Sequence, residues 1–385
     1  MTTEPMPSRR RFLRYAAGAA SLAVLGGAGA VGFAGGVHPN AAAYGYWRQK
    51  EKNGLSDPQY LALCATLAPS PHNTQPWKFG IAGDRIEIFA DLSRHLGTAD
   101  AEFRMMQTAI GSALENIDVA AGRLGYRAEV QDLDADRRFA QDGYCASVRL
   151  HRGQVVRDGS FDALFTRQTT RTEYDMSQPV PAALKTALNQ RTGDLPGIGL
   201  TWFPDGPLVT RLGNVLRGSV RGFLSDDRNR DGMKWFRITP DQWETRRDGI
   251  AVFNGDAPLL AKRYVEWFVH EQDLLSAQFK QGEIDTLDRL VSTTPAWGLI
   301  YADRATPNQR IQAGRLAERV YLEAAARGYA VQPLCYPTEF EPSREGLREL
   351  AGLAPAQDPL FLFRIGKSDY VAKSVRRDLK EVLLA

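Results

Sequence analysis

The chain has 385 residues, of which 48 are Lys or Arg and 45 are Asp or Glu, so its formal net charge is +3. Four arginines against one glutamate among residues 1–14 account for this whole surplus, and the rest of the chain is formally neutral. A neutral body lacks the clustered basic charge that nucleic-acid binding requires, which argues against that function. With 43% hydrophobic and 24% charged residues, the chain is expected to form a globular protein with a full core.

Metal sites and hydrolytic machinery are not indicated by the sequence. Cys64, Cys145 and Cys335 lie far apart and form no CxxC pair, so neither a disulfide framework nor a thiolate zinc site is expected, although a single disulfide stays open. The five histidines show no HExxH or HxH spacing, and no GxSxG motif is present. We therefore predict no metal and name no catalytic acid, base or nucleophile.

The N-terminal segment has the layout of an export signal. Ser8-Arg9-Arg10-Arg11-Phe12-Leu13-Arg14 is followed by residues 15–47, which contain no Lys, Arg, Asp or Glu. This layout resembles a twin-arginine (Tat) signal, and 15 of the 22 residues from 15 to 36 are Ala or Gly, which disfavours a membrane anchor. The resemblance implies a signal region at residues 1–43, recognition by the Tat export machinery, and a location in the periplasm or on the outer face of the cytoplasmic membrane. Cleavage after a small-residue segment and an uncleaved tether both stay open.

A helix and a β-hairpin are expected first after this region. Asp57 and Pro58 form a typical helix start, and Pro69 ends the helix. Strand-like runs at 78–81 and 85–89 are separated by a short Gly-containing turn, which predicts a hairpin.

Two long helices of similar pattern follow. From Asp100 onward, apolar residues recur at spacings of three and four until Gly125. A second such helix begins at Thr306-Pro307 and stops at Gly328. The first helix falls on the second after a shift of 203 residues, which pairs Gly111 with Gly314, Glu115 with Glu318, Ala121 with Ala324, Gly125 with Gly328 and Tyr126 with Tyr329.

The repeat predicts two related α+β halves, because a strand-like run follows each helix, at 144–150 and at 360–365. Chance agreement between two helices that end in Gly-Tyr is the alternative. We place the halves at residues 44–160 and 161–385. Much of the extra length of the second half lies at about 221–280, a charged and Trp-bearing insertion that could form a lid or an interface.

Two short segments carry candidate binding chemistry. In the run Ala68–Trp77, the amides of Asn73 and Gln75 can both donate and accept hydrogen bonds, as a heteroaromatic ring such as a flavin requires; a polar turn that caps local backbone is the alternative. Arg167 and Arg171, with a threonine between them, would form a phosphate clamp, or else a solvated basic surface.

Together these segments resemble the nitroreductase superfamily of FMN enzymes. Its P-S-x-x-N-x-Q-P-W motif is matched at Ser70, Asn73, Gln75, Pro76 and Trp77, and its R-x-S/T-x-R motif at Arg167, Thr169 and Arg171. The resemblance implies that the first segment approaches the isoalloxazine ring across a dimer interface and that the second holds the FMN phosphate.

Two weaker matches extend the resemblance. Gln332, Pro333 and Leu334 correspond to the stretch whose backbone lies near flavin N5, and Arg376 and Arg377 correspond to a terminal basic pair at the phosphate. A helix-end charge cluster is the alternative for these two arginines.

The order of the motifs resembles the Acg-type, tandem branch of the superfamily, which also agrees with the Tat-like signal. The amide motif occurs only in the first half and the basic motif only in the second. This implies an α+β, nitroreductase-like fold in which two related halves are fused into an intertwined pseudo-dimer around antiparallel-rich central sheets. One FMN per chain and a monomeric pseudo-dimer are expected.

The function implied is that of an exported FMN-binding oxidoreductase. Electrons from NAD(P)H or another donor would pass by ping-pong exchange through flavin N5 to a nitroaromatic, quinone or similar small-molecule acceptor. Because NAD(P)H belongs to the cytoplasm, a flavin-sequestering or redox-sensing protein with little turnover is the alternative.

Overall fold

The computed structural model describes residues 42–384 apart from 132–134, 226, 252–264, 266 and 371–372. The predicted signal region, residues 1–43, therefore lies almost wholly outside the described residues. Within the described part of the chain, no helix is both long enough and apolar enough to cross a membrane.

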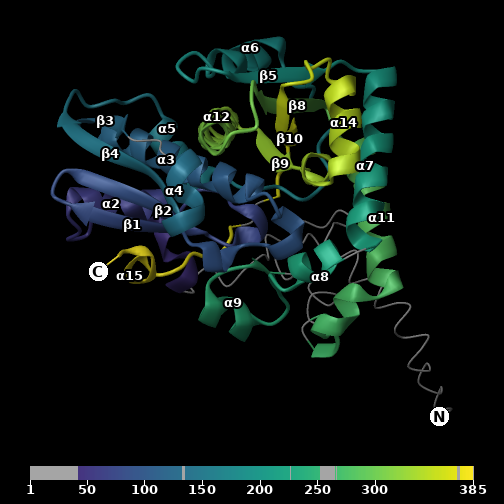
Figure 1. Cartoon of the computed structure of the whole chain (residues 1–385), viewed down its shortest axis with the longest axis horizontal. Coiled ribbons are helices and arrows are strands. Elements are labelled where there is room, and N and C mark those ends of the chain that lie inside the picture. Colours follow the sequence, from purple (N-terminus) through teal and green to yellow (C-terminus); the bar gives the residue numbers. More distant parts are fainter. Residues whose placement is uncertain are drawn as a thin grey trace.

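Two four-stranded antiparallel sheets form the framework of the molecule (Figure 1). Every neighbouring pair of strands in them is antiparallel, so the predicted α+β fold with antiparallel central sheets is confirmed. In spatial order the first sheet is β1 (Trp77–Ala82), β2 (Arg85–Ala90), β4 (Tyr144–Arg152) and β3 (Tyr126–Gln131), and the second is β5 (Ile198–Phe203), β8 (Ala296–Ala302), β10 (Asp358–Gly366) and β9 (Ala330–Pro333).

Both sheets follow the same chain order. In each sheet the first two strands pair, a 20-residue helix follows the second strand, and the fourth strand lies between the second and the third. These helices are α3 (Arg104–Arg123) and α12 (Pro307–Ala326), and Figure 1 views α12 almost end-on between the two sheets. The 203-residue sequence repeat is thus accompanied by a repeat of topology, as expected for two related halves.

Helices α3 and α12 cross in close contact at two glycines. An added Cβ on Gly111 would overlap the backbone oxygen of Ile311, and one on Gly314 would overlap the backbone oxygen of Thr108. Because Ile311 is 203 residues after Thr108, the two contacts are exchanged by the repeat, which is the property of a two-fold dimer interface. The Ser112 hydroxyl adds a 3.0 Å hydrogen bond to the carbonyl of Gly314. The crossing is therefore the interface of a pseudo-dimer within one chain.

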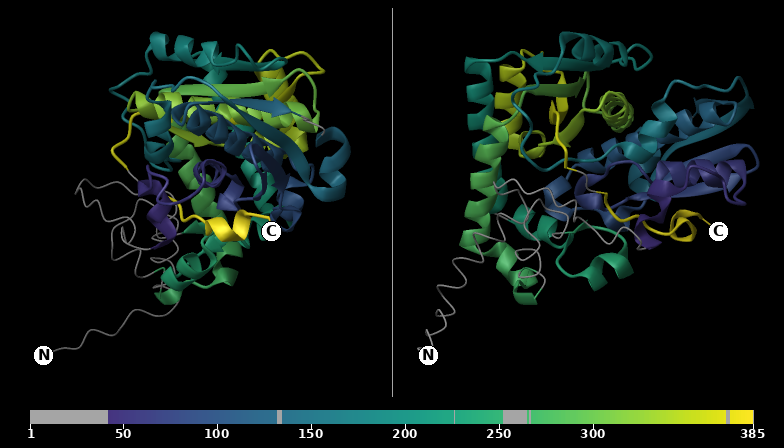
Figure 2. Two further views of the ribbon diagram at one scale, coloured as in Figure 1. Left: turned by 90° about the vertical axis from the view of Figure 1, so that its left-hand side faces the viewer. Right: turned by 180° about the vertical axis from the view of Figure 1, so that it is seen from behind.

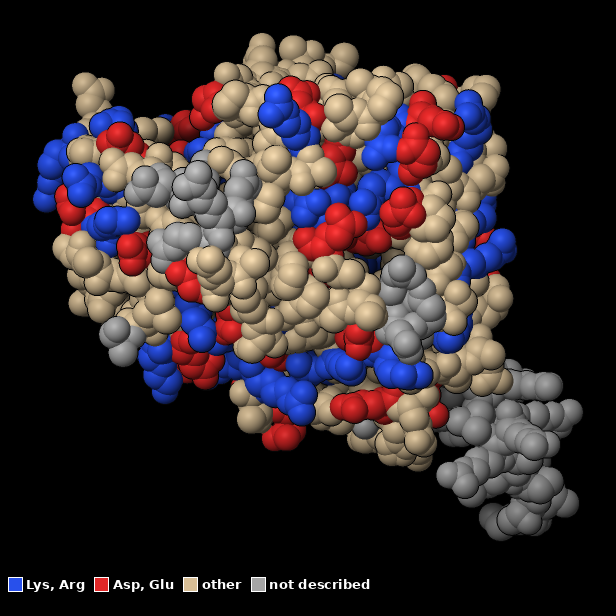
Figure 3. All heavy atoms as spheres, viewed as in Figure 1, with Lys and Arg blue, Asp and Glu red and all other residues tan. Residues whose placement is uncertain are grey.

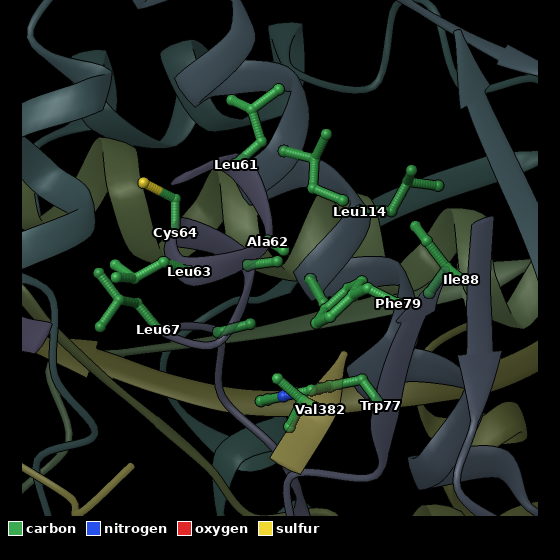
Figure 4. Packing of buried hydrophobic residues seen from close by; sticks show 14 of the residues in the cluster. Leu61, Ala62, Leu63, Cys64, Leu67, Trp77, Phe79, Ile88, Leu114 and Val382 are labelled. Atoms are coloured by element: carbon green, nitrogen blue, oxygen red, sulfur yellow. The ribbon is translucent and has the colours of Figure 1, made fainter. Parts of the chain in front are cut away.

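Separate apolar cores cover the sheets. The first sheet packs on α2 (Asp57–Ala65) and α3, and Figure 4 shows Trp77, Phe79 and Ile88 of the sheet beside Leu61 and Leu114 of these helices. In the second sheet successive residues point to opposite faces. One face packs on α12, and the other on α7 (Pro207–Ser225) and α14 (Glu341–Leu350).

A large insertion distinguishes the second half from the first. A two-residue turn joins β1 to β2, whereas the equivalent connection from β5 to β8 runs over residues 204–295. Figures 1 and 2 show its helices α7 and α11 along one side of the second sheet. The predicted insertion at 221–280 lies within this connection; the predicted half boundaries stay predictions. After α7 the connection contains α8 (Asp227–Met233), β6 (Phe236–Arg237), α9 (Pro240–Arg246), β7 (Ile250–Ala251), η6 (Glu271–Leu275) and α11 (Ala277–Ser292).

The predicted hairpin and both long helices are present, but α2, the helix before the hairpin, begins one residue earlier than predicted. Ser56 rather than Asp57 is the N-cap of α2, because its hydroxyl accepts from the Gln59 backbone N–H while the Gln59 side chain accepts from the Ser56 N–H. The remaining elements are the 3₁₀ turns η1 (Ala42–Arg48), η2 (Pro71–Asn73), η3 (Leu92–Arg94) and η4 (Gly97–Asp100), and the helices α4 (Ala135–Asp142), α5 (Ser160–Thr166), α6 (Ala182–Gln190), α13 (Tyr336–Glu339) and α15 (Leu379–Val382).

Candidate functional site

The polar turn between α2 and β1 has an unusual backbone. His72, Asn73 and Gln75 all have positive φ angles of 47°, 53° and 51°, a region that non-glycine residues seldom adopt. The Ser70 hydroxyl accepts a 3.0 Å hydrogen bond from the Gln75 backbone N–H across the turn. Left-handed residues in such a cluster mark positions that the surrounding structure must hold in place.

The side chain of Asn73 ties this turn to two distant segments. Its amide nitrogen donates to the carbonyls of Gly249 and Val375 at 3.2 and 3.1 Å, and its amide oxygen accepts from Arg376 at 2.9 Å. Asn73 therefore joins the first half to the insertion and to the C-terminal segment.

Gln75 makes a similar pair of links. Its amide nitrogen donates to the Arg247 carbonyl at 2.7 Å, and its amide oxygen accepts from the Arg377 backbone N–H at 2.9 Å. These hydrogen bonds agree with the alternative interpretation, in which the side-chain amides of both residues bind groups of the protein instead of a flavin. Flavin binding by Asn73 and Gln75 stays a prediction, and it would require an exchange of these hydrogen bonds.

Arg167 lies at the end of α5 and is buried. Its guanidinium donates to the Leu67 carbonyl at 2.6 Å, and its Nε lies 3.5 Å from Glu318 but has no hydrogen-bond partner among the described residues. The rings of Trp47 and Tyr321 lie within 5.4 and 5.1 Å of its guanidinium carbon. Arg167 thus has a free donor beside two aromatic rings.

Arg376 reaches the same place from the C-terminal segment. It is buried and donates to Asn73 Oδ1 and to the carbonyls of Leu67 and Ala68, while its Nε has no hydrogen-bond partner within the described structure. Burial, with a smaller effect of Arg167, holds the pKa of Arg376 well below its usual range.

Lys373 and Arg171 complete a group of four basic side chains. The Lys373 ammonium lies 4.4 Å from the Trp47 ring, and burial followed by repulsion from Arg167 and Arg376 lowers its pKa to about 6. Burial also lowers the pKa of Arg171, whose guanidinium makes no hydrogen bond or ion pair in the part of the chain that the structure describes. Arg167, Arg171, Lys373 and Arg376 are called the cation cluster below.

The three arginines of the cation cluster border a small cavity, whereas Lys373 donates to the carbonyls of Thr166 and Arg167 beside it. The volume of the cavity is about 30 Å³, and its lining residues come from η1, from the polar turn, from the Arg167–Arg171 segment and from the C-terminal segment. Buried cations that repel one another are stabilised by a bound anion, because the anion offsets both their repulsion and their lost hydration. On the face in Figure 3, in contrast, acidic and basic side chains are interspersed. This cavity is therefore the candidate anion site.

A larger cavity of about 250 Å³ adjoins the small one. Both cavities are bordered by Pro69, Ser70, Thr169 and Arg171. The large cavity is lined mainly by apolar side chains from α3, β9, β10 and the insertion. An apolar cavity that opens beside an anion site suits a flat apolar ring system carrying a phosphate.

Nine of the eleven predicted binding residues line these cavities. Ser70, Thr169, Arg171, Gln332, Pro333 and Leu334 border the large cavity, while Asn73, Arg167 and Arg376 border the small one. Gln75 and Arg377 border neither of the two. Arg377 instead donates to the Gln75 carbonyl at 3.1 Å, so it supports the polar turn from behind. The ligand roles of all eleven stay predictions.

The stretch predicted to lie near flavin N5 is held by the second sheet. The Gln332 side-chain oxygen accepts from the buried Arg364 at 2.7 Å, and the Leu334 N–H donates to the Leu362 carbonyl at 2.8 Å. The carbonyl of Val331 accepts from the Thr170 N–H, so this stretch also anchors the basic motif. The two predicted segments are thus positioned by one another.

Many of the other cavity residues belong to no motif, and three of them illustrate what the sequence could show. Trp47 borders the small cavity, and Tyr321 and Glu283 border the large one. Tyr321 lies three residues after Glu318 on α12, so the amphipathic pattern of this helix was the sequence signal that could have identified it. For Trp47 and Glu283 the sequence offers no local signal, because each reaches its cavity only through long-range packing.

His72 borders the large cavity as well. Burial, with a smaller effect of the nearby Arg171, lowers its pKa to about 4. The imidazole is therefore neutral at physiological pH and can accept a proton only at acid pH. No group of three or more His, Cys, Asp or Glu that could hold a metal ion occurs among the described residues.

Glu318 is expected to oppose anion binding in the small cavity when it is ionised. It is fully buried, and burial raises its pKa to about 7 despite the nearby Arg167. An anion and an ionised Glu318 repel each other, so binding favours the protonated carboxyl and weakens as pH rises through about 7. The Glu318→Gln variant should therefore bind sulfate more tightly than the parent protein at pH 8, by up to about tenfold, since one pKa unit corresponds to tenfold in affinity.

Calorimetric titration with sulfate at pH 6 and pH 8 measures this effect. At pH 6 the two proteins should bind sulfate alike. Glu115→Gln is the matched control, because Glu115 is the repeat counterpart of Glu318 but pairs with Arg315 and Arg319 instead. Equal sulfate affinity of the parent and Glu318→Gln at pH 8 would show that Glu318 does not act on this cavity.

Comparison with known proteins found similarity to several nitroreductases. Two proteins of Mycobacterium tuberculosis are similar over much of the chain. One, Rv3131 of strain H37Rv, bears a name that assigns it provisionally to the NAD(P)H nitroreductases and is 24% identical over 340 residues, which cover 83% of this chain and 88% of that protein. The other, the uncharacterized protein MT1398 of strain CDC 1551, is 25% identical over 285 residues, covering 72% of this chain and 38% of that protein.

Solved structures give weaker likenesses. The FMN-dependent nitroreductase NfnB from Mycobacterium smegmatis, solved in complex with NADPH, is 16% identical with a TM-score of 0.40, covering 58% of this chain and 96% of that chain. A nitroreductase with bound FMN from Desulfitobacterium hafniense is 12% identical with a TM-score of 0.36, covering 60% of this chain and 99% of that chain. Residues 262–367, which contain β8, α12, β9 and β10, match the family described as the Nitroreductase family. The family match therefore covers much of the second sheet and the long helix of the second half.

Proposed function

We propose that this protein binds one FMN per chain and acts as a nitroreductase-type oxidoreductase. The single observation that carries the proposal is the cation cluster, whose three arginines, buried or half-buried, line a small cavity that adjoins a larger apolar one. The family match over residues 262–367 and the name of the similar mycobacterial protein support the same conclusion.

The residues of the small cavity fit a phosphate group. Arg167 Nε and Arg376 Nε are buried without a hydrogen-bond partner, and Arg171 has no partner within the described residues. Guanidinium groups match phosphate oxygens in both charge and geometry. In this proposal Arg167, Arg171 and Arg376 hold the phosphate, and the Thr169 hydroxyl, now 2.9 Å from the Tyr321 hydroxyl, adds a polar contact.

The large cavity fits the ring system and an electron acceptor. Ser70 and the Gln332–Leu334 stretch lie on its wall, and its other lining is mainly apolar. FMN, when bound, supplies the redox chemistry, taking electrons from a donor such as NAD(P)H and passing them to an acceptor such as a nitroaromatic or a quinone. The protein's own residues bind the phosphate, orient the ring and exclude water from it.

Export is part of the proposal. The Tat-like segment Ser8–Arg14 supports recognition by the Tat machinery and delivery to the periplasm or to the outer face of the cytoplasmic membrane. Since the Tat route carries folded proteins, FMN would bind before export. The fused halves already provide the interface that a homodimer makes between chains, which supports a monomer as the working unit. The same fusion supports a place in the tandem, Acg-type branch.

A flavin-sequestering protein with little turnover is the second candidate. The observation in its favour is that the insertion forms one wall of the large cavity, through residues such as Phe223, Phe236 and Ile250. A ring covered by the insertion would exchange slowly with a donor or an acceptor.

Absorbance spectroscopy of the purified full chain tests the proposal. We expect flavin bands from a chromophore that mass spectrometry identifies as FMN; a colourless protein that ignores added FMN contradicts the proposal. Anaerobic NADPH titration of the same sample then separates the two candidates. Bleaching by NADPH supports the oxidoreductase, whereas flavin that is reduced only by dithionite supports sequestration.

A further inference from the structure

One face of helix α11 forms part of the wall of the large cavity. Glu283, Thr286, Leu287 and Leu290 all border this cavity, and their spacings of three and four residues place them on one side of the helix. Helix α11 packs beside α7, where Asp288 pairs with Arg217 at 2.5 Å, and Figure 1 shows both helices along one side of the second sheet. Glu283 is the one ionisable residue of this face, and it lies in a wall that is otherwise apolar or weakly polar.

Glu283 has no partner for its charge. Its Oε1 is buried and makes no hydrogen bond, and the side chain makes no ion pair within the part of the chain that the structure describes. Burial alone raises the pKa of Glu283 to about 7. An acid of this kind is half protonated at neutral pH, which is the condition that general acid catalysis favours.

The other ionisable groups of the cavity are less suited to donate a proton at neutral pH. His72 is already neutral. Burial raises the pKa of Glu339 to about 8, but this carboxyl is engaged, since it accepts a 3.1 Å hydrogen bond from the Thr338 hydroxyl and lies 3.9 Å from Arg104. Burial raises the pKa values of the remaining acidic groups far above neutral pH, and Arg171 stays a cation. These remaining groups are Tyr321, Cys335 and Tyr336.

We propose that Glu283 is the general acid of this cavity and transfers its carboxyl proton to an oxygen of a bound quinone acceptor. The inference rests on the proposed function, in which reduced FMN supplies the two electrons and one proton as a hydride equivalent. The O–H bond of Glu283 breaks and a new O–H bond forms on the quinone, which completes the hydroquinone. The carboxylate that remains then recovers a proton from water.

The first test follows reoxidation of the FMN-loaded protein. The protein is reduced with stoichiometric dithionite and mixed with menadione in a stopped-flow instrument between pH 5.5 and 8.5. The parent rate should fall as pH rises through about 7. Glu283→Gln should react about a hundredfold more slowly, at the lower end of what a general acid contributes, and without this pH dependence.

The matched control is Asp285→Asn on the same helix. Asp285 is exposed and accepts a hydrogen bond from Gln281 at 2.7 Å, so this variant changes the same charge away from the cavity. It should reoxidise like the parent. A yellow Glu283→Gln protein with the parent's rate and pH profile would overturn this inference alone, whereas a protein that binds no FMN would overturn the proposed function and this inference with it.

A second measurement needs neither FMN nor activity. Because folding raises the pKa of Glu283 from 4.5 to about 7, its contribution to stability is present in full below about pH 4.5 and is lost as pH rises to about 7. Thermal unfolding of the FMN-free protein should therefore depend less on pH between about 5 and 7 in Glu283→Gln than in the parent or in Asp285→Asn. Identical pH dependence in all three proteins would show that Glu283 is not the perturbed acid that the proposal requires.

Discussion

Replacing Gly111 by alanine is expected to destabilise the protein by about 3 kcal/mol, the upper end of what overpacking costs. The added methyl group would overlap the backbone oxygen of Ile311 on α12. A backbone atom inside a helix cannot move aside as the end of a flexible side chain can, so α3 and α12 would have to separate. Because these helices join the two halves, the loss of packing extends along the whole crossing.

Urea unfolding followed by circular dichroism measures this effect. Gly314→Ala should behave in the same way, since an added Cβ there would overlap the backbone oxygen of Thr108. Gly218→Ala is the control, because Gly218 is also within a helix, α7, but has no atom within 4 Å of the added Cβ. That substitution should be neutral or stabilise by up to about 1 kcal/mol. Equal midpoints for Gly111→Ala and Gly218→Ala would mean that the crossing is looser than described.

Replacing Arg171 by alanine is expected to weaken FMN binding about 10- to 150-fold, because the loss of a charged hydrogen bond costs about 1.5 to 3 kcal/mol. Arg171 borders both cavities, and among the described residues it has no other partner to satisfy. Its removal therefore leaves no unpaired protein group behind, and the effect should appear in cofactor affinity rather than in stability. Fluorescence titration of the FMN-free protein with FMN measures the dissociation constant.

Two further variants define the role of Arg171. Arg171→Lys should recover part of the affinity, because a lysine keeps the charge but loses the planar fork that matches two phosphate oxygens. Arg211→Ala, which removes an exposed arginine that borders neither cavity, should bind FMN like the parent. FMN affinity that is unchanged in Arg171→Ala would remove this residue from the cofactor site.

Local and repeated patterns predicted much of the fold. The hairpin of β1 and β2, the helices α3 and α12, and the relation between the halves all follow from periodicity and from residues such as Gly111 and Gly314. These features are encoded by neighbouring residues or by a pattern that occurs twice. The two four-stranded sheets with a common strand order are the structural form of that repeat.

The contacts that shape the candidate site could not be predicted in this way. The motif residues are assembled by partners far away in the chain, such as Gly249 and Val375 for Asn73, and no short pattern specifies such pairs. The wall formed by α11 was beyond prediction for a similar reason. Its insertion occurs once, so the repeat offers no template for how Glu283 reaches the cavity.

The hydrogen bond between Asn73 and Arg376 has a consequence for the order of assembly. These residues are 303 positions apart, and they meet at the small cavity together with Arg167. During synthesis the first half can form its sheet early, but the anion site stays incomplete until the segment containing Arg376 has been made. Contacts between such distant residues slow folding, because a long loop must close before they form. Cofactor binding should therefore occur late, after the segment containing Arg376 has been synthesised.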